Sequence, residues 1–166
     1  VAGGGMDAAA RDELLAELAA TGVLFSRKLG PGRGSAPGHL ALVADAASLK
    51  EDGINTVGIM ANDYATYPAD SPDKMLVFAA RYGFGFPYLV DETQEVARAW
   101  GAVCTPDFFG LNAAGELQYR GRIDDAKMGD ASTRTPELLT AMRQIAATGT
   151  SPAEQLPSMG CSVKWR

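Results

Sequence analysis

Cysteine and histidine are nearly absent from this chain, which has two cysteines and one histidine among its 166 residues. Two cysteines are too few for a disulfide framework. Cys104 and Cys161 are also 57 positions apart, with no further ligand at the spacing of a metal site. We therefore expect His39 to be a surface or capping residue. The sequence predicts no bound metal and no other cofactor.

Long apolar runs and basic clusters are missing as well. No apolar stretch approaches the roughly 20 residues that a membrane-spanning helix needs, and the N-terminus lacks the pattern of a signal peptide. The formal net charge is −5 and the basic residues are scattered, so we expect neither a nucleic-acid nor a lipid surface. The first residue is Val1, which is compatible with removal of an upstream segment. We expect a soluble protein, either cytoplasmic or organellar after such removal.

The length and composition favour one globular domain. Hydrophobic residues make up 46% of the chain and charged residues 21%, as in ordinary soluble proteins. We predict a helical extension over 1–22, a single domain over 23–149, and an irregular tail over 150–166 that packs on the domain. The glycine-rich stretch 30–38 is typical of a loop and matches no phosphate-binding pattern. Asp63, Asp124 and Asp125 are predicted to be solvated turn residues.

Hydrophobic periodicity predicts alternating helices and strands. In the second helix, Leu40, Val43 and Ala47 are spaced to face a core, and Asp91 with Gln94 resembles a capping box. The alternation favours an α/β fold with a central mixed sheet flanked by helices. The predicted helices are 8–20, 39–51, 72–82, 91–100 and 135–148, and the predicted strands are 23–25, 56–60, 87–90 and a hairpin of 108–111 with 116–123.

Seven short stretches follow one another in order: Ile-Met-Ala-Asn-Asp at 59–63, Tyr-Pro-Ala-Asp-Ser-Pro at 67–72, Phe-Pro-Tyr-Leu at 86–89, 91–97, Val-Cys-Thr-Pro-Asp-Phe-Phe at 103–109, Tyr-Arg-Gly-Arg at 119–122 and Gly-Cys-Ser-Val-Lys-Trp at 160–165. Together they resemble the thioredoxin-like, peroxiredoxin-like family of the alkyl hydroperoxide reductase/thiol-specific antioxidant type. The resemblance covers about 53–166. It implies a thioredoxin-like fold and oxidoreductase ancestry, although a fold does not determine function.

The resemblance also implies a Cys-x-x-Cys motif after the first core strand, and this chain lacks it. Residues 1–103 contain no cysteine. Counted back from the strand at Val57, the equivalent positions are about Ser26 and Leu29. A redox thiol reacts as its thiolate and needs a second thiol to resolve the mixed disulfide. A serine hydroxyl is far too weakly acidic for the first step and a leucine cannot perform the second, so we expect a degenerate redox site.

In the family that this chain resembles, the peptide bond equivalent to Thr105–Pro106 is cis and borders the redox site. Its main-chain groups pair with an extended segment, so Thr105 and Pro106 are candidate binding residues. A turn retained only for folding is the alternative. Cys104 is either a buried small hydrophobe or a redox thiol. A disulfide between Cys104 and Cys161 would need their Cα atoms within about 7 Å.

Two functional hypotheses follow. The first is a thioredoxin-fold protein without dithiol chemistry that acts as a binding or structural component, a peripheral subunit of a larger assembly with a protein partner. The second is a thiol–disulfide oxidoreductase or one-cysteine peroxidase that uses Cys104, with Cys161 as the resolving thiol. A third possibility is that the residues up to about Gly38 are not the natural start, through a shifted reading frame or an incomplete gene model, because the resemblance begins after them.

Overall fold

The computed structural model describes residues 22–26, 36–126 and 131–166, and the helix predicted over 8–20 lies outside them. In this part of the chain, five strands form one mixed sheet in the order β3-β2-β1-β5-β6, and two short strands form a separate ribbon. β1, β2 and β3 are parallel, whereas β5 is antiparallel to both β1 and β6. The strands are β1 (Gly22–Ser26), β2 (Asn55–Met60), β3 (Tyr88–Val90), β4 (Cys104–Thr105), β5 (Asp107–Leu111), β6 (Leu117–Gly121) and β7 (Cys161–Ser162).

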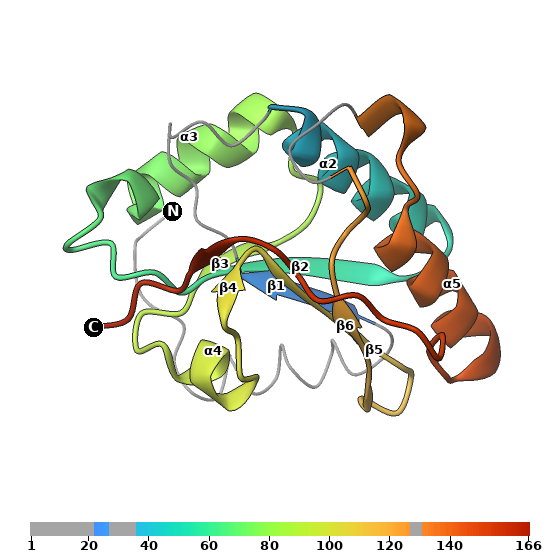
Figure 1. Ribbon diagram of the computed structural model, residues 1–166. Helices are drawn as coiled ribbons and strands as arrows, with labels where there is room; N and C mark the ends of the chain where they lie inside the picture. The colour runs from blue at the N-terminus through green and yellow to red at the C-terminus, as the bar shows by residue number, and fades with distance from the viewer. Residues whose placement is uncertain (1–21, 27–35, 127–130) are drawn as a thin grey trace.

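Helices lie on both faces of the sheet (Figure 1). Leu49 of α2 and Met142 of α5 share one core, whereas Ala97 of α4 and Phe109 of β5 belong to the core of the other face. The α/β class with a central mixed sheet and flanking helices is therefore confirmed. None of the helices in the described residues is long and apolar enough to cross a membrane. The helices are α2 (Ala36–Glu51), α3 (Pro72–Tyr82), α4 (Glu95–Ala99) and α5 (Glu137–Thr148), with short 3-10 turns at Pro68–Asp70 and Ala131–Thr133.

Several element ends follow directly from local sequence. Gly83 and Gly149 have φ values of 66° and 78° and terminate α3 and α5, as predicted, because a residue without a Cβ adopts the left-handed conformation freely. Gly110 of β5 has a different use. A Cβ there would collide with the Sδ atom of Met142, so the glycine lets α5 pack closely on the sheet.

The buried face of α2 differs from the prediction. Leu40 is 59% exposed and Ala47 is also exposed, whereas Leu49 and Asp45 are buried. A carboxylate on the inward face conceals the true apolar stripe, because sequence patterning treats every aspartate as outward-facing. Asp45 is tolerated there because Arg134 pairs with it.

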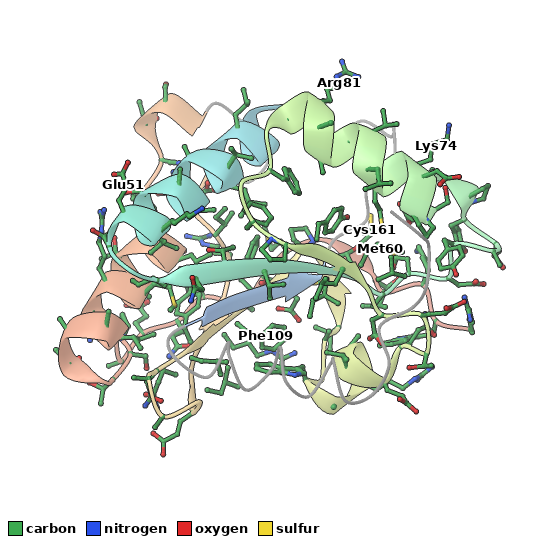
Figure 2. All side chains as sticks on the ribbon, turned by 180° about the vertical axis from the view of Figure 1, so that it is seen from behind. Glu51, Met60, Lys74, Arg81, Phe109 and Cys161 are labelled. Carbon is green, nitrogen blue, oxygen red and sulfur yellow. The ribbon has the colours of Figure 1, made fainter. Side chains whose placement is uncertain are left out.

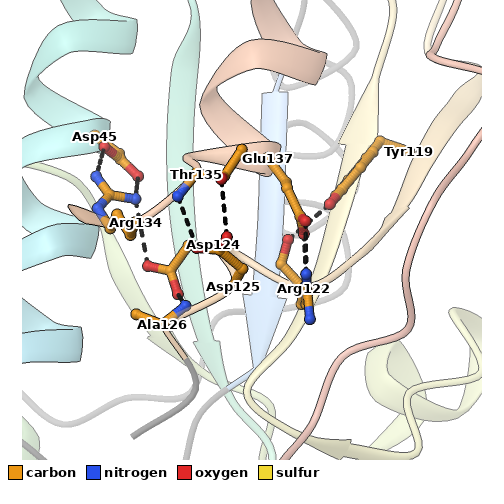
Figure 3. A network of polar contacts seen from close by, with 9 residues as sticks. All are labelled: Asp45, Tyr119, Arg122, Asp124, Asp125, Ala126, Arg134, Thr135 and Glu137. Carbon is orange, nitrogen blue, oxygen red and sulfur yellow. Dashed lines mark hydrogen bonds and ion pairs between the residues drawn. The ribbon is translucent and has the colours of Figure 1, made fainter. Parts of the chain in front are cut away.

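Arg134 joins α2 to the connection between β6 and α5 (Figure 3). Its Nη1 atom donates to Asp45 Oδ2 at 2.9 Å and to Asp124 Oδ2 at 3.3 Å, and its side chain is only 13% exposed. The prediction of solvated turn residues is wrong for Asp124 and Asp63, which are both buried. Asp125 is exposed, as predicted. A shared guanidinium thus neutralises two carboxylates that come from distant parts of the chain.

We predict that Arg134→Met lowers the free energy of unfolding by about 3 kcal/mol, because it leaves two buried carboxylates without their cation. The matched control is Arg143→Met, which removes an arginine from a largely exposed pair with Asp52 and should cost less than about 1 kcal/mol. Urea denaturation of the two variants measures both values. Equal losses would contradict a structural role for the buried pair.

Candidate functional site

The register of β1 places the predicted site residues at one edge of the sheet. Ser26, the last residue of β1, pairs with Ile59 of β2 and with Asp107 of β5. The Thr105–Pro106 bond is cis and directly precedes Asp107, so it lies just beyond the carboxyl end of β1. In open α/β sheets the carboxyl ends of the strands are where ligands bind. This carboxyl edge is therefore the candidate site.

Figure 2 shows Met60, which ends β2, and Cys161 at this same end of the molecule. The structure thus brings Thr105, Pro106 and Cys161 to the carboxyl end of β1, beside the backbone of Ser26. Leu29, the second position predicted for the lost motif, lies outside the described residues.

Beside the cis peptide bond, β4 and β7 form an antiparallel ribbon. Cys104 lies opposite Ser162, and Thr105 lies opposite Cys161. Because successive side chains of a strand point to opposite faces, the two thiols are on opposite faces of the ribbon. Both are free; Cys104 is buried and Cys161 is exposed. This geometry does not favour a disulfide between them.

The surroundings of Cys104 oppose formation of its thiolate. The residue is 8% exposed, and its Sγ atom donates to the carbonyl oxygen of Pro106 at 3.3 Å. Burial, followed by the charge of Asp107, raises the pKa of the Cys104 thiol to about 11, and Arg120 opposes this shift only in part. These features favour a buried small hydrophobe over a nucleophile.

Asp107 stabilises the loop on both sides of the cis bond. Its Oδ2 atom accepts from the backbone N–H of Val103 at 3.2 Å and from Arg120 Nη2 at 3.4 Å. Arg120 also donates to the carbonyl oxygen of Gly101 and lies over the ring of Phe109, 5.1 Å from its centroid. The carboxylate of Asp107 thus stabilises the position of β4.

The described part of the edge offers no metal-binding cluster. No group of three or more His, Cys, Asp or Glu side chains among the described residues could hold a metal ion. Thr105 donates through its hydroxyl to the carbonyl oxygen of Cys161 at 3.3 Å. The edge thus provides main-chain and side-chain hydrogen bonds of the kind that suit an extended peptide.

Gln94 is a site residue that the sequence did not reveal. The capping box predicted for Asp91 and Gln94 is confirmed only for Asp91, whose Oδ2 atom accepts from the backbone N–H of Ala97 in the first turn of α4 at 2.8 Å. The side chain of Gln94 makes no capping bond, and its backbone has a φ of 63°. The buried amide of Gln94 is thereby free to bind Lys164 and Arg166, about 70 residues away, and no local signal indicates such partners.

Asn62 is the second amide that sequence reasoning missed. Its Oδ1 atom accepts from the backbone N–H of Lys164 at 2.9 Å, and its Nδ2 atom donates to Asp70 Oδ2 at 3.0 Å. Asp70 is completely buried, so it fixes which way the amide of Asn62 points.

The parallel strands, the antiparallel hairpin and the cis-proline loop define a thioredoxin-like protein. Its structure is similar to that of the thioredoxin-like superfamily protein SPOA0173, with a TM-score of 0.59 at 23% identity over 83% of this chain and 87% of that one. Two solved structures are more similar. They are a hypothetical protein SMc02350 from Sinorhizobium meliloti 1021 (TM-score 0.81, 32% identity, 92% and 84% coverage) and an uncharacterized conserved protein from Geobacillus kaustophilus (TM-score 0.79, 36% identity, 89% and 78% coverage).

The sequence comparisons indicate which thioredoxin-like family the chain resembles. The model of the AhpC/TSA family matches residues 39–120. A putative peroxiredoxin, Rv2521 of Mycobacterium tuberculosis, is 32% identical over 73 residues, and the match spans 44% of this chain and 41% of the length of that relative. The family model and the putative peroxiredoxin, together with the thioredoxin-like fold, support assignment of the chain to the thioredoxin-like, peroxiredoxin-type family. The structural likeness covers 92% of the chain, so it extends to residues before Gly53, further than the sequence resemblance predicted.

We predict that only one thiol of the native protein reacts rapidly with Ellman's reagent at pH 8. With a pKa of about 11, the Cys104 thiol is ionised in roughly one molecule in a thousand at this pH, and its burial also blocks the reagent. Cys161 is exposed and should react. Cys161→Ser should remove the fast phase and Cys104→Ser should preserve it. Two fast thiols in the native protein would contradict the burial of Cys104.

Proposed function

We propose that this protein is a thioredoxin-fold binding component without dithiol chemistry, which holds a protein partner non-covalently and serves as a peripheral subunit of a larger assembly. The observation that carries the proposal is the state of Cys104: its thiol is buried, hydrogen-bonded to Pro106 and raised in pKa to about 11. Ser26 and Leu29 at the predicted motif positions supply no replacement thiol.

The binding position in this proposal is the carboxyl edge at Thr105 and Pro106. The cis bond lies next to β4, whose main chain already pairs with an extended strand. Pairing of this kind needs no sulfur, so it can persist after loss of the dithiol motif. The division into an extension over 1–22, a domain over 23–149 and a tail over 150–166 stays a prediction.

The competing function is a thiol–disulfide oxidoreductase or one-cysteine peroxidase with Cys104 and Cys161. The name of the curated relative, a putative peroxiredoxin, favours it. It requires ionisation of a thiol with a pKa of about 11. It also requires two sulfur atoms on opposite faces of the β4–β7 ribbon to meet, so the ribbon would have to open first.

Turnover assays separate the two functions. We expect the wild-type protein to reduce insulin disulfides and consume hydrogen peroxide at the same rate as a Cys104→Ser/Cys161→Ser double variant, with dithiothreitol as the reductant in both assays. The double variant is the matched control because it removes both thiols and changes one atom in each side chain. A wild-type rate clearly above that of the double variant would refute the proposal in favour of the enzyme.

Partner retention tests the positive half of the proposal. The protein is purified from its native source without reductant, in the wild-type and double-variant forms, and the co-purifying proteins are compared. We expect the same partner in both, because non-covalent pairing does not depend on a thiol. A partner that is lost from the double variant, or released from the wild type by reductant, would indicate a mixed disulfide instead.

A further inference from the structure

The segment 160–166 crosses the carboxyl ends of the parallel strands. It pairs with β4 through Cys161, beyond β1, and next meets Asn62 and Asp63, which follow β2. Its end reaches Gln94, which follows β3. Figure 1 shows this last stretch passing from α5 along the sheet toward the C-terminal end of the chain. The segment therefore covers the edge at which ligands bind in open α/β sheets.

The edge contacts the main chain of this segment more than its side chains. The backbone of Lys164 is bound on both sides: its N–H donates to Asn62 Oδ1 at 2.9 Å, and its carbonyl oxygen accepts from the N–H of Asp63 and from Gln94 Nε2, both at 2.8 Å. Gln94 Oε1 also accepts from the N–H of Arg166 at 2.9 Å. These bonds depend on an extended backbone and not on a particular side chain.

Two positions of the segment are restricted by shape. A Cβ on Gly160 would collide with the carbonyl group of Thr105, whose backbone is held by β4. Val163 is buried in the core cluster that includes Ala61 and Ala97. An occupant of the edge therefore needs a glycine and, three residues later, a small apolar side chain.

Basic and aromatic residues of the segment meet complementary groups on the surface. Arg166 Nε lies 3.2 Å from Asp63 Oδ1, and the ring of Trp165 lies under the guanidinium of Arg98 at 4.3 Å. A hydrogen bond from the Thr66 side chain, with a further one from Arg166, lowers the pKa of Asp63, although burial opposes the shift. The edge thus presents a carboxylate that stays ionised near neutral pH to a basic end of the segment.

The groups that hold the segment are fixed independently of it. Asn62 is oriented by Asp70, and Gln94 Nε2 also donates to the carbonyl oxygen of Ala61 at 2.7 Å. By contrast, the segment is anchored in the apolar core by Val163 alone, and Trp165 remains 39% exposed. The edge is therefore the pre-formed partner in this contact, whereas the segment 160–166 has little apolar anchorage.

We propose that residues 160–166 act as a built-in pseudoligand that competes for the carboxyl edge with an extended peptide of a partner. The competing peptide carries a glycine, a small apolar residue three positions later, and a basic residue beyond it. Release of the segment exposes Asn62, Asp63, Gln94 and the free edge of β4 to that peptide. This inference rests on the proposed binding function, to which it adds the class of partner and the means of its control.

The test is binding of a fluorescein-labelled peptide of residues 160–166, with serine at the position of Cys161, to the full chain, followed by fluorescence anisotropy. Gly160→Ala weakens the built-in segment and leaves the edge intact. Because the apparent affinity is proportional to the fraction of molecules with an open edge, we expect the peptide to bind the Gly160→Ala chain at least about tenfold more tightly than the wild type. Met159→Ala changes an exposed neighbour of the segment and should behave as the wild type.

A second substitution tests whether the peptide uses the same edge. Adding Gln94→Met to the Gly160→Ala chain keeps the side-chain volume and removes the amide, so it should abolish the gain in peptide affinity while circular dichroism confirms folding. Equal peptide affinity of the wild-type and Gly160→Ala chains, or a gain that survives Gln94→Met, would overturn the pseudoligand. Neither result affects the turnover assays, so a failure here is distinguishable from a failure of the proposed function.

Discussion

The register of β1 against its two neighbours is the constraint on which the candidate site depends. Ser26 pairs with Ile59 on one side and with Asp107 on the other. This pairing places the cis Thr105–Pro106 bond at the same level as the end of β2. A shift by one residue would turn every side chain of β1 to the other face and would separate these two features. The carboxyl edge is therefore a property of the sheet as a whole.

The chemistry of the edge follows from which groups are buried. The buried thiol lies beside a buried carboxylate, and both desolvation and charge make its ionised form costly. The exposed thiol belongs to a strand that pairs with the cis-proline loop and faces away from the buried one. The edge also presents two buried amides with fixed orientations. Such groups suit the recognition of a peptide backbone.

Local sequence predicted the elements whose determinants are local. The hairpin around 112–115 and the glycine ends of α3 and α5 depend on residues within a few positions, and they were predicted correctly. The burial of Cys104 also agrees with the usual state of an unpaired cysteine.

The failures at Asp45 and Gln94 share one physical cause, which is a buried polar residue with a distant partner. Asp45 misdirected the prediction of the α2 face because Arg134, its partner, is 89 residues away. Gln94 was mistaken for a capping residue because its bonds reach Lys164 and Arg166. The opposite orientation of the two thiols depends on the β4–β7 register, which no pattern in a single sequence specifies.

Recognition through the backbone of Lys164 has a consequence for how binding partners would be found. Because Asn62, Asp63 and Gln94 contact peptide groups, most side chains of an occupant are free to vary without loss of these bonds. Under the proposal of a competing peptide, peptides that bind the edge would share little overall sequence similarity with residues 160–166. The features that such a peptide must share with the segment are an extended backbone, a glycine at the position of Gly160 and a small apolar side chain at the position of Val163.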